Sequence, residues 1–163
     1  MKALRTRGGL AAVAAAAALA LTGCSTADTA AIVNGTTITV SEAQEAVRQI
    51  KEAQPAAQIT TPSAVQALIF APFINEEAAK SGKGQSDSSA KAALGGTVTN
   101  PSRATLDLVK ASMVSQQLTQ EETDAIRREI AAADITLNPR FGTIDQANAQ
   151  FGPPQTNWLK PQG

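Results

Sequence analysis

The chain of 163 residues contains no histidine and no tyrosine, and it has only one cysteine and one tryptophan. Without histidine it cannot form a Ser-His-Asp triad, a Cys-His dyad or the usual kinds of zinc site. The single cysteine, Cys24, excludes an internal disulfide and a redox pair of cysteines. Hydrolysis by carboxylates alone is still chemically feasible. We therefore predict a protein without cofactor or metal that is not an enzyme.

The sequence Leu-Thr-Gly-Cys at positions 21–24 is typical of the lipobox of bacterial lipoproteins. It follows a basic stretch, residues 1–9, with three Lys and Arg and no acid, and an apolar run, residues 10–21, of only Ala, Val and Leu. At about 1.5 Å per residue this run spans roughly 18 Å, too short for a bilayer core of about 30 Å. We therefore predict a lipoprotein signal peptide over residues 1–23 and lipid attachment at Cys24.

The predicted lipid places the protein at the extracytoplasmic face of the cell membrane, with residues 24–29 as a short lipidated tether. Two or three acyl chains hold a protein stably at a membrane, whereas one chain does so only marginally. Removal of the signal leaves about 140 residues, the usual size of one domain. Three of the fourteen basic residues lie in the signal, so eleven Lys and Arg face fourteen Asp and Glu. This excess of acid argues against nucleic acid as a partner.

Most of the remaining chain has the pattern of amphipathic helices, with β-rich segments near both ends of the domain. Residues 31–33 and 37–40 flank Asn34-Gly35, the strongest signal for a two-residue hairpin turn. Residues 134–137 alternate like a strand, and we expect them to pair with this hairpin. The predicted fold is mainly α, a bundle of about five helices with a small N-terminal β-hairpin and a C-terminal strand.

Capping residues and prolines predict where the helices begin. The expected starts are the N-caps Ser41, Thr61, Ser86 or Asp87, and Asn100, with a last helix around Glu121. The sequence Gly-Lys-Gly at 82–84 lies between two helices and lacks the Ser or Thr that follows the lysine of a phosphate-binding loop. Residues 138–163 have no helical period, and we expect an extended tail that packs over the helices through its aromatic side chains.

The second predicted helix carries a wider apolar surface than a single core contact requires. A protein that holds unfolded polypeptides needs exposed apolar area and no reacting group. The candidate peptide-binding residues are Ile69, Phe70, Phe73 and Ile74 on this helix, and Met113 on a later one. The alternative is that these side chains form the core, because a domain of this size buries most of its large apolar residues.

Residues 31–42, Ala-Ile-Val-Asn-Gly-Thr-Thr-Ile-Thr-Val-Ser-Glu, resemble the opening of the SurA and PrsA family of extracytoplasmic folding factors. In that family a segment Val-Asn-Gly-x-x-Ile-Thr-x-x-Glu/Asp leads into the first helix of the chaperone domain. The resemblance implies a SurA N-terminal-like chaperone domain over residues 30–137. Full-length relatives insert a parvulin-type prolyl isomerase module before their last helix. Here Leu118 and Glu121 are almost adjacent and histidine is absent, so only the chaperone part is expected.

The sequence thus leads to a membrane-anchored folding factor that binds unfolded or nascent exported polypeptides. A structural lipoprotein that docks on one folded envelope partner stays open as the alternative. A carboxylate-dependent hydrolase is disfavoured. Its candidate pairs, Glu76 with Glu77 and Glu121 with Glu122, are consecutive on helices and point about 100° apart.

Overall fold

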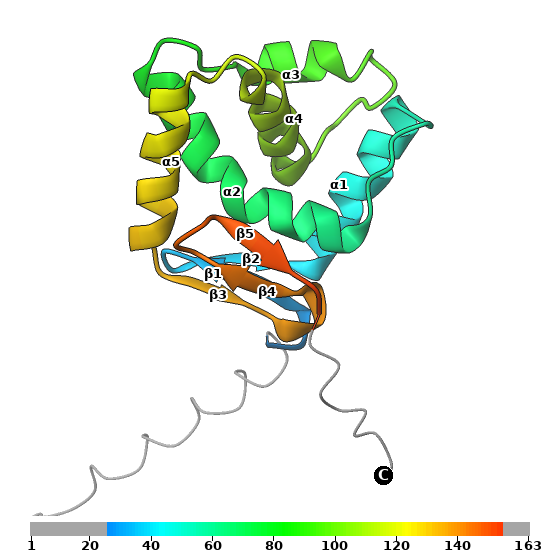
Figure 1. The fold of residues 1–163 in the computed structure, drawn as a ribbon. Helices are drawn as coiled ribbons and strands as arrows, with labels where there is room; N and C mark the ends of the chain where they lie inside the picture. Colours follow the sequence, from blue (N-terminus) through cyan, green and yellow to red (C-terminus); the bar gives the residue numbers. More distant parts are fainter. Residues whose placement is uncertain (1–25, 155–163) are drawn as a thin grey trace, which may run out of the picture.

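The computed structural model describes residues 26–154, in which five α-helices stand over two small antiparallel sheets (Figure 1). The helices are α1 (Val40–Ala53), α2 (Thr61–Lys80), α3 (Asp87–Ala93), α4 (Arg103–Ser115) and α5 (Gln120–Ala132). The strands are β1 (Thr29–Val33), β2 (Thr36–Thr39), β3 (Ile135–Leu137), β4 (Thr143–Asp145) and β5 (Gln150–Gly152). Two short 3-10 helices are η1 (Thr26–Asp28) and η2 (Pro139–Phe141). The mainly helical fold is therefore confirmed, whereas Cys24 and the signal lie outside the described residues.

The larger sheet has the order β2-β1-β3, so the N-terminal strand lies in its middle. Asn34 and Gly35 have φ angles of 49° and 80°, positive at both central positions as a type I′ turn requires, so the predicted two-residue hairpin turn is confirmed. β3 pairs antiparallel with β1, with Val33 opposite Ile135, and this confirms the predicted strand pairing. Residues 26–29, which were assigned to the predicted tether, form η1 and the first residue of β1, and the rest of the tether lies outside the described residues.

α2 occupies the centre of the helical layer. It contacts α1, α4, α5, both strands of the hairpin β1–β2, and η2. Its buried residues are distributed along the helix on more than one face: Ala64, Val65, Leu68, Ile69, Ala71, Phe73 and Ala78. A helix that is covered on most sides is apolar around its circumference. The wide apolar surface of the second predicted helix is therefore mainly core.

The first helix begins two residues before the expected position. Its N-cap is Thr39 rather than Ser41, because Glu42 lies three residues after Thr39 and completes a capping box with it. The Glu42 carboxylate accepts from the Thr39 backbone N–H at 2.8 Å. Ser41 instead lies in the first turn, where its hydroxyl donates to Asp28 at 2.9 Å.

Two further helix starts also differ from expectation by one or two residues. α2 is capped by Thr60 rather than Thr61, and α4 by Ser102 rather than Asn100. In both helices the cap is the residue whose hydroxyl accepts the backbone N–H three positions later. The predicted N-cap Ser86 of α3 is confirmed.

The chain after β3 packs on the helices through Phe141 and Phe151, as expected, but it forms regular elements rather than the predicted extended tail. Residues 139–152 form η2 and the hairpin β4–β5. This segment, η2 together with the hairpin, is attached to the helices at two places. Gln66 on α2 donates to the Phe141 carbonyl at 3.2 Å, and Gln146 donates to the Ile130 and Ala133 carbonyls at 3.1 and 2.8 Å, at the end of α5. Trp158 lies outside the described residues.

The buried side chain of Gln49 joins α1 to the start of α4. Only 3% of Gln49 is exposed. Its carbonyl oxygen accepts from the Thr105 hydroxyl at 2.6 Å and from the Ser102 backbone N–H at 2.8 Å. Its amide donates to the Asn100 carbonyl at 3.3 Å. The Gln49 side chain therefore provides hydrogen-bond partners for three polar groups at the start of α4: the Asn100 carbonyl, the Ser102 N–H and the Thr105 hydroxyl.

We expect Gln49→Ala to lower the free energy of unfolding by about 2–3 kcal/mol, because it leaves the buried Thr105 hydroxyl without its acceptor. Urea denaturation of the chain from residue 24 onward measures this. The control is Gln44→Ala, an exposed position on the same helix, which should change stability by less than about 0.5 kcal/mol. Equal effects of the two substitutions would contradict the role given to Gln49.

Gly142 should be the least replaceable glycine of the C-terminal hairpin. Its φ angle is 127°, and a Cβ atom there would lie 2.6 Å from the Gly152 carbonyl oxygen. We expect Gly142→Ala to cost about 1–3 kcal/mol, from backbone strain and this clash. The control Gly96→Ala has a φ angle of 74° but nothing within 4 Å of the added atom, so it should cost only about 1 kcal/mol. Thermal denaturation of both variants compares them.

Candidate functional site

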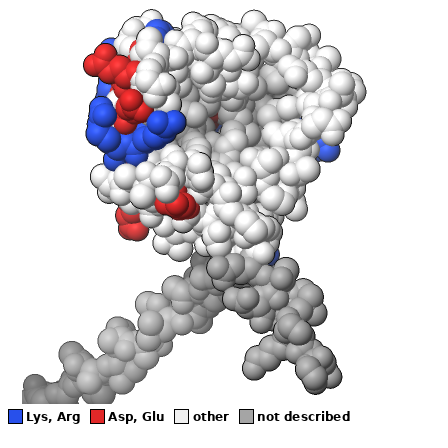
Figure 2. Space-filling view, in the orientation of Figure 1, with Lys and Arg blue, Asp and Glu red and all other residues white. Residues whose placement is uncertain are grey.

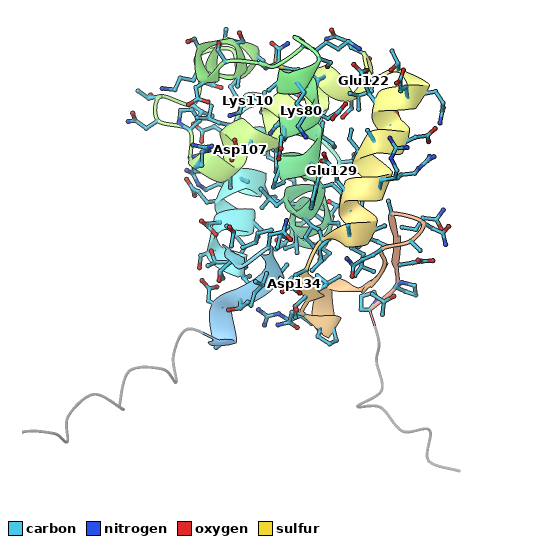
Figure 3. All side chains as sticks on the ribbon, turned by 90° about the vertical axis from the view of Figure 1, so that its left-hand side faces the viewer. Lys80, Asp107, Lys110, Glu122, Glu129 and Asp134 are labelled. Carbon is cyan, nitrogen blue, oxygen red and sulfur yellow. The ribbon has the colours of Figure 1, made fainter. Side chains whose placement is uncertain are left out.

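A first groove, called the mixed groove, has a volume of about 560 Å³ and lies between the β1–β2 hairpin, α2 and α4. Its lining combines apolar side chains, such as Phe73, with five charged ones, of which Arg103, Asp107 and Lys110 lie together on α4, while Glu42 caps α1 and Glu76 pairs with Lys80. The charged groups bind one another. Asp107 accepts from Arg103 Nε at 2.8 Å, and its other carboxylate oxygen lies 2.8 Å from Lys110 Nζ (Figure 3). These charges are therefore already engaged within the protein.

Lys110 connects this groove to α3. Its ammonium group lies 3.0 Å from the Asp87 carboxylate, in the first turn of α3, and its side chain is only 12% exposed. Burial alone would lower the pKa of Lys110, but the hydrogen bonds to Asp107 and Asp87 outweigh it and raise the pKa above its usual value. The hydrogen bond from Lys110 in turn lowers the pKa of Asp87. Lys110 is therefore a charged group that links α4 to α3 within the fold.

A second groove, called the uncharged groove, has a volume of about 450 Å³ and is bordered by α1, α2, α3, α4 and the α1–α2 loop. Its lining contains no Lys, Arg, Asp or Glu. The apolar lining residues are Ile50, Ile59, Ala67, Ala93, Leu94, Leu108, Val109 and Met113. Its polar groups are the side chains of Gln54, Ser112 and Gln116. The groove thus offers apolar contact with a few neutral hydrogen-bonding groups.

The exposure of the lining residues separates the groove's floor from its accessible walls. Leu94 and Leu108 are buried and form part of the folded interior. Ile50, Val109 and Met113 are half-buried, so part of each apolar side chain faces solvent.

In Figure 1 the helices that border the groove lie above the sheets. Figure 2 shows one face of the molecule, on which charged side chains gather at one edge, over α5.

The five candidate peptide-binding residues lie in different environments in the structure. Ile69 is fully buried and Phe73 is 6% exposed, so both belong to the core and offer little contact surface. Phe70 is half-buried and its ring centroid lies 4.7 Å from that of Phe151 on β5. Ile74 packs against the core as well. Met113 alone among the five lines the uncharged groove.

Sequence reasoning missed Ile59 and Val109 as groove residues. Ile59 lies in the loop between α1 and α2, where no helical period identifies a face. Val109 is adjacent to the buried Leu108 on α4, and Met113 follows four residues later on the same side of the helix. Positions 106, 109 and 113 share one apolar face of α4, and the buried residues at 108 and 111 lie on another; this second apolar face is the signal that could have indicated the groove.

One member of each acidic pair considered for hydrolysis, Glu76 and Glu122, is engaged with a lysine. Lys80 on α2 reaches Glu129 on α5 at 2.8 Å and Glu76 at 3.1 Å (Figure 3). Lys83 lies 2.6 Å from Glu122 and also donates to the Gln117 carbonyl at 3.0 Å. The lysine of the Gly-Lys-Gly segment therefore ties the α2–α3 connection to the start of α5.

Glu122 has two structural partners. It forms the capping box of α5 with Thr119, whose backbone N–H donates to it at 2.6 Å, and it accepts from Lys83. The hydrogen bond from Lys83, followed by that from the Thr119 backbone, lowers the pKa of Glu122 from 4.5 to about 2. This carboxylate is therefore ionised and engaged at neutral pH, with no proton to donate to a substrate.

Among residues 26–154, no group of three or more acidic, histidine or cysteine side chains is arranged to hold a metal ion. Within the same range, no helix combines the length and hydropathy needed to cross a bilayer. Every buried side-chain nitrogen and oxygen in this part of the chain has a hydrogen-bond partner. The polar interior of the described fold is thus fully satisfied by its own residues.

No family model, curated protein or solved structure matches the chain. The resemblance to the SurA and PrsA family thus depends on the sequence features already given, chiefly residues 31–42. In the structure these residues form most of β1, all of β2 and the first turn of α1. The functional argument therefore depends on the grooves and their contacts.

The Lys83–Glu122 pair should make stability depend on pH between about 4.5 and 2. Because folding lowers the pKa of Glu122, its contribution is fully present above pH 4.5 and is lost as the pH falls toward about 2. We expect Glu122→Gln to reduce the slope of unfolding free energy against pH in this window. Glu121→Gln, an exposed neighbour, is the control and should leave the slope unchanged. Denaturant unfolding at a series of pH values tests both variants.

Proposed function

We propose that the protein is a membrane-anchored extracytoplasmic lipoprotein that binds apolar segments of unfolded or exported polypeptides in the uncharged groove. The observation that carries this proposal is a groove of about 450 Å³ with half-buried Ile50, Val109 and Met113 in its walls and no charged residue in its lining. Contact with water is unfavourable for these apolar surfaces, and a bound apolar side chain removes it.

The neutral lining supports recognition of many sequences rather than one. A buried charge in a groove demands a matching partner, because an unpaired buried charge is strongly unfavourable. This groove has none. Met113 adds an unbranched side chain that adopts several shapes, as is typical of surfaces that bind diverse apolar partners. The three neutral polar groups, on Gln54, Ser112 and Gln116, supply hydrogen bonds to a bound backbone.

The expected affinity of the uncharged groove is suitable for reversible binding of client polypeptides. Burial of one large apolar side chain contributes about 1.5–3 kcal/mol, so two anchoring side chains contribute roughly 3–6 kcal/mol before the cost of ordering the peptide. These energies correspond to dissociation constants from tens of micromolar to millimolar. A lipid attached at Cys24 would offset such weak binding, because clients that emerge at the same membrane meet the groove at a high effective concentration.

Phe70 and the mixed groove fit this function less well. The Phe70 ring packs against Phe151, so a peptide would have to displace the C-terminal hairpin before it reached that ring. In the mixed groove, Arg103 and Lys110 are held by Asp107, so neither is free to pair with a client. The uncharged groove requires neither displacement nor the breaking of an ion pair.

A charge placed in the groove should abolish client binding without unfolding the protein. We expect Met113→Glu to weaken binding of an apolar peptide about tenfold or more, because the complex would bury an unpaired carboxylate. The readouts are fluorescence anisotropy of the labelled peptide and suppression of aggregation of a chemically denatured client. Circular dichroism verifies the fold.

The matched control is Ala131→Glu, which adds the same charge at an exposed position of α5. It should bind peptide and suppress aggregation like the unchanged chain. If the unchanged chain shows neither activity at stoichiometric excess, the proposal fails. Association with a single folded envelope protein, together with indifference to unfolded clients, would instead favour the docking lipoprotein.

A further inference from the structure

The strand β2 lies at an edge of the larger sheet, with β1 on one side only. The backbone groups of a strand bond alternately to its two neighbours. On β1, the Asn34 N–H donates to the Asp134 carbonyl of the β3 side, and the Ala30 carbonyl accepts from the Asn138 N–H on that side. The even-numbered residues of β1 therefore bond to β3 and the odd-numbered ones to β2.

Thr37 is the residue of β2 whose backbone groups this alternation directs outward. It lies opposite Ile32, which bonds to β3, so the Thr37 N–H and carbonyl point away from β1. Thr37 is exposed, and none of the described residues bonds to these two groups. Thr39 has the same orientation, but its N–H already donates to Glu42. Thr37 is therefore the residue at which β2 offers both a free donor and a free acceptor.

The mixed groove lies along this strand. Thr37 and both of its neighbours on β2 line it, together with Leu68, Ala71 and Pro72, which share one face of α2. Pro72 has no N–H, so the Leu68 carbonyl lacks the donor that an α-helix normally supplies four residues later. The groove therefore combines a free strand edge with an apolar helix face in which one carbonyl has no helical donor.

An extended polypeptide segment fits this arrangement. A residue placed opposite Thr37 in an antiparallel pair accepts from its N–H and donates to its carbonyl. The two neighbours of Thr37 lie opposite Val33 and Ala31, which are buried in the core on the side that contacts α2. Residues directly opposite each other share a face of the sheet. The side chains on either side of the paired residue would therefore enter the groove.

The charges around the mixed groove favour a segment with basic side chains. Three acids and two bases line the groove. When their partners Asp87 and Lys80 are included, the count is four acids and three bases, so acid stays in excess. Asp107 and Lys110 lie on the helical side of the groove, above the strands (Figure 3). An acidic segment would be repelled by the excess charge, whereas a basic one would be attracted.

We propose that the mixed groove binds an extended segment of another polypeptide as a fourth strand of the larger sheet, paired with Thr37 of β2. The segment has an apolar side chain on each side of the paired residue and basic residues at its ends. Pairing through the backbone leaves the ion pairs of Asp107 intact. The two grooves share no lining residue, so this inference goes beyond the proposed function and does not depend on it.

A heptapeptide, acetyl-Lys-Ser-Val-Thr-Val-Ser-Lys-amide, tests the pairing in an NMR titration of the isotope-labelled chain from residue 24 onward. Its two valines determine the register and place its threonine opposite Thr37. We expect saturable binding and slower hydrogen exchange of the Thr37 amide. A peptide with Glu in place of both Lys should bind more weakly at low salt.

Two methylated peptides identify the backbone contribution. An N-methyl group on the peptide's threonine removes the donor to the Thr37 carbonyl and adds bulk at the edge, so it should weaken binding about tenfold or more. The matched control carries the same group on the last lysine, beyond the paired residue, and should bind within about twofold of the unmodified peptide.

Thr37→Pro tests the same pair from the side of the protein. It removes the outward N–H and leaves the bonds between β1 and β2 in place, as proline on an edge strand can. We expect binding of the heptapeptide to fall about tenfold or more. Binding of an apolar peptide in the uncharged groove should stay unchanged, and this retained activity also verifies the fold. If this variant does not fold, the methylated peptides still decide.

Equal binding of the two methylated peptides overturns the proposal, because backbone pairing would then contribute nothing. Absence of binding at millimolar peptide, or binding that leaves the exchange of the Thr37 amide unchanged, overturns it as well. Slower exchange that depends on protein concentration without any peptide would show that a second copy occupies the edge, and this also overturns the proposal. None of these outcomes bears on the uncharged groove.

Discussion

Burial of α2 is the interaction on which the rest of the structure depends. α1, α4, α5, the first sheet and η2 all pack on this helix, and Val65 and Ile69 within it have no exposed surface. Because several elements share one apolar partner, the domain has one continuous core rather than separate contacts. The uncharged groove lies where α1, α3 and α4 do not close completely over the first half of α2.

The elements with strong local signals could be predicted from the sequence. Asn34-Gly35 determines its own turn, because both residues tolerate positive φ angles, and the alternation of residues 135–137 marks a strand with one face inward. Helix starts were less accurate, since neighbouring Ser and Thr residues compete and the acceptor geometry decides between them. The hairpin β4–β5 could not be predicted, because it packs on distant residues such as Phe70, which contacts Phe151.

The candidate site was only partly predictable for a related reason. Apolar periodicity identifies residues that avoid water, but it does not distinguish a helix surrounded by others from a helix that faces a client. Ile69 and Met113 have similar apolar character, yet only the neighbours of each determine that the first is sealed and the second is accessible. Composition was more reliable, because a missing histidine excludes its chemistry in any fold.

The position of β1 between β2 and β3 has a consequence for biogenesis. Asn34 and Asp134, which bond across the open end of the β1–β3 pair, are 100 residues apart in the chain. The sheet cannot be completed until nearly the whole polypeptide is available, and such distant pairings form slowly. A chain synthesised from its N-terminus therefore completes this sheet only when its synthesis is nearly finished.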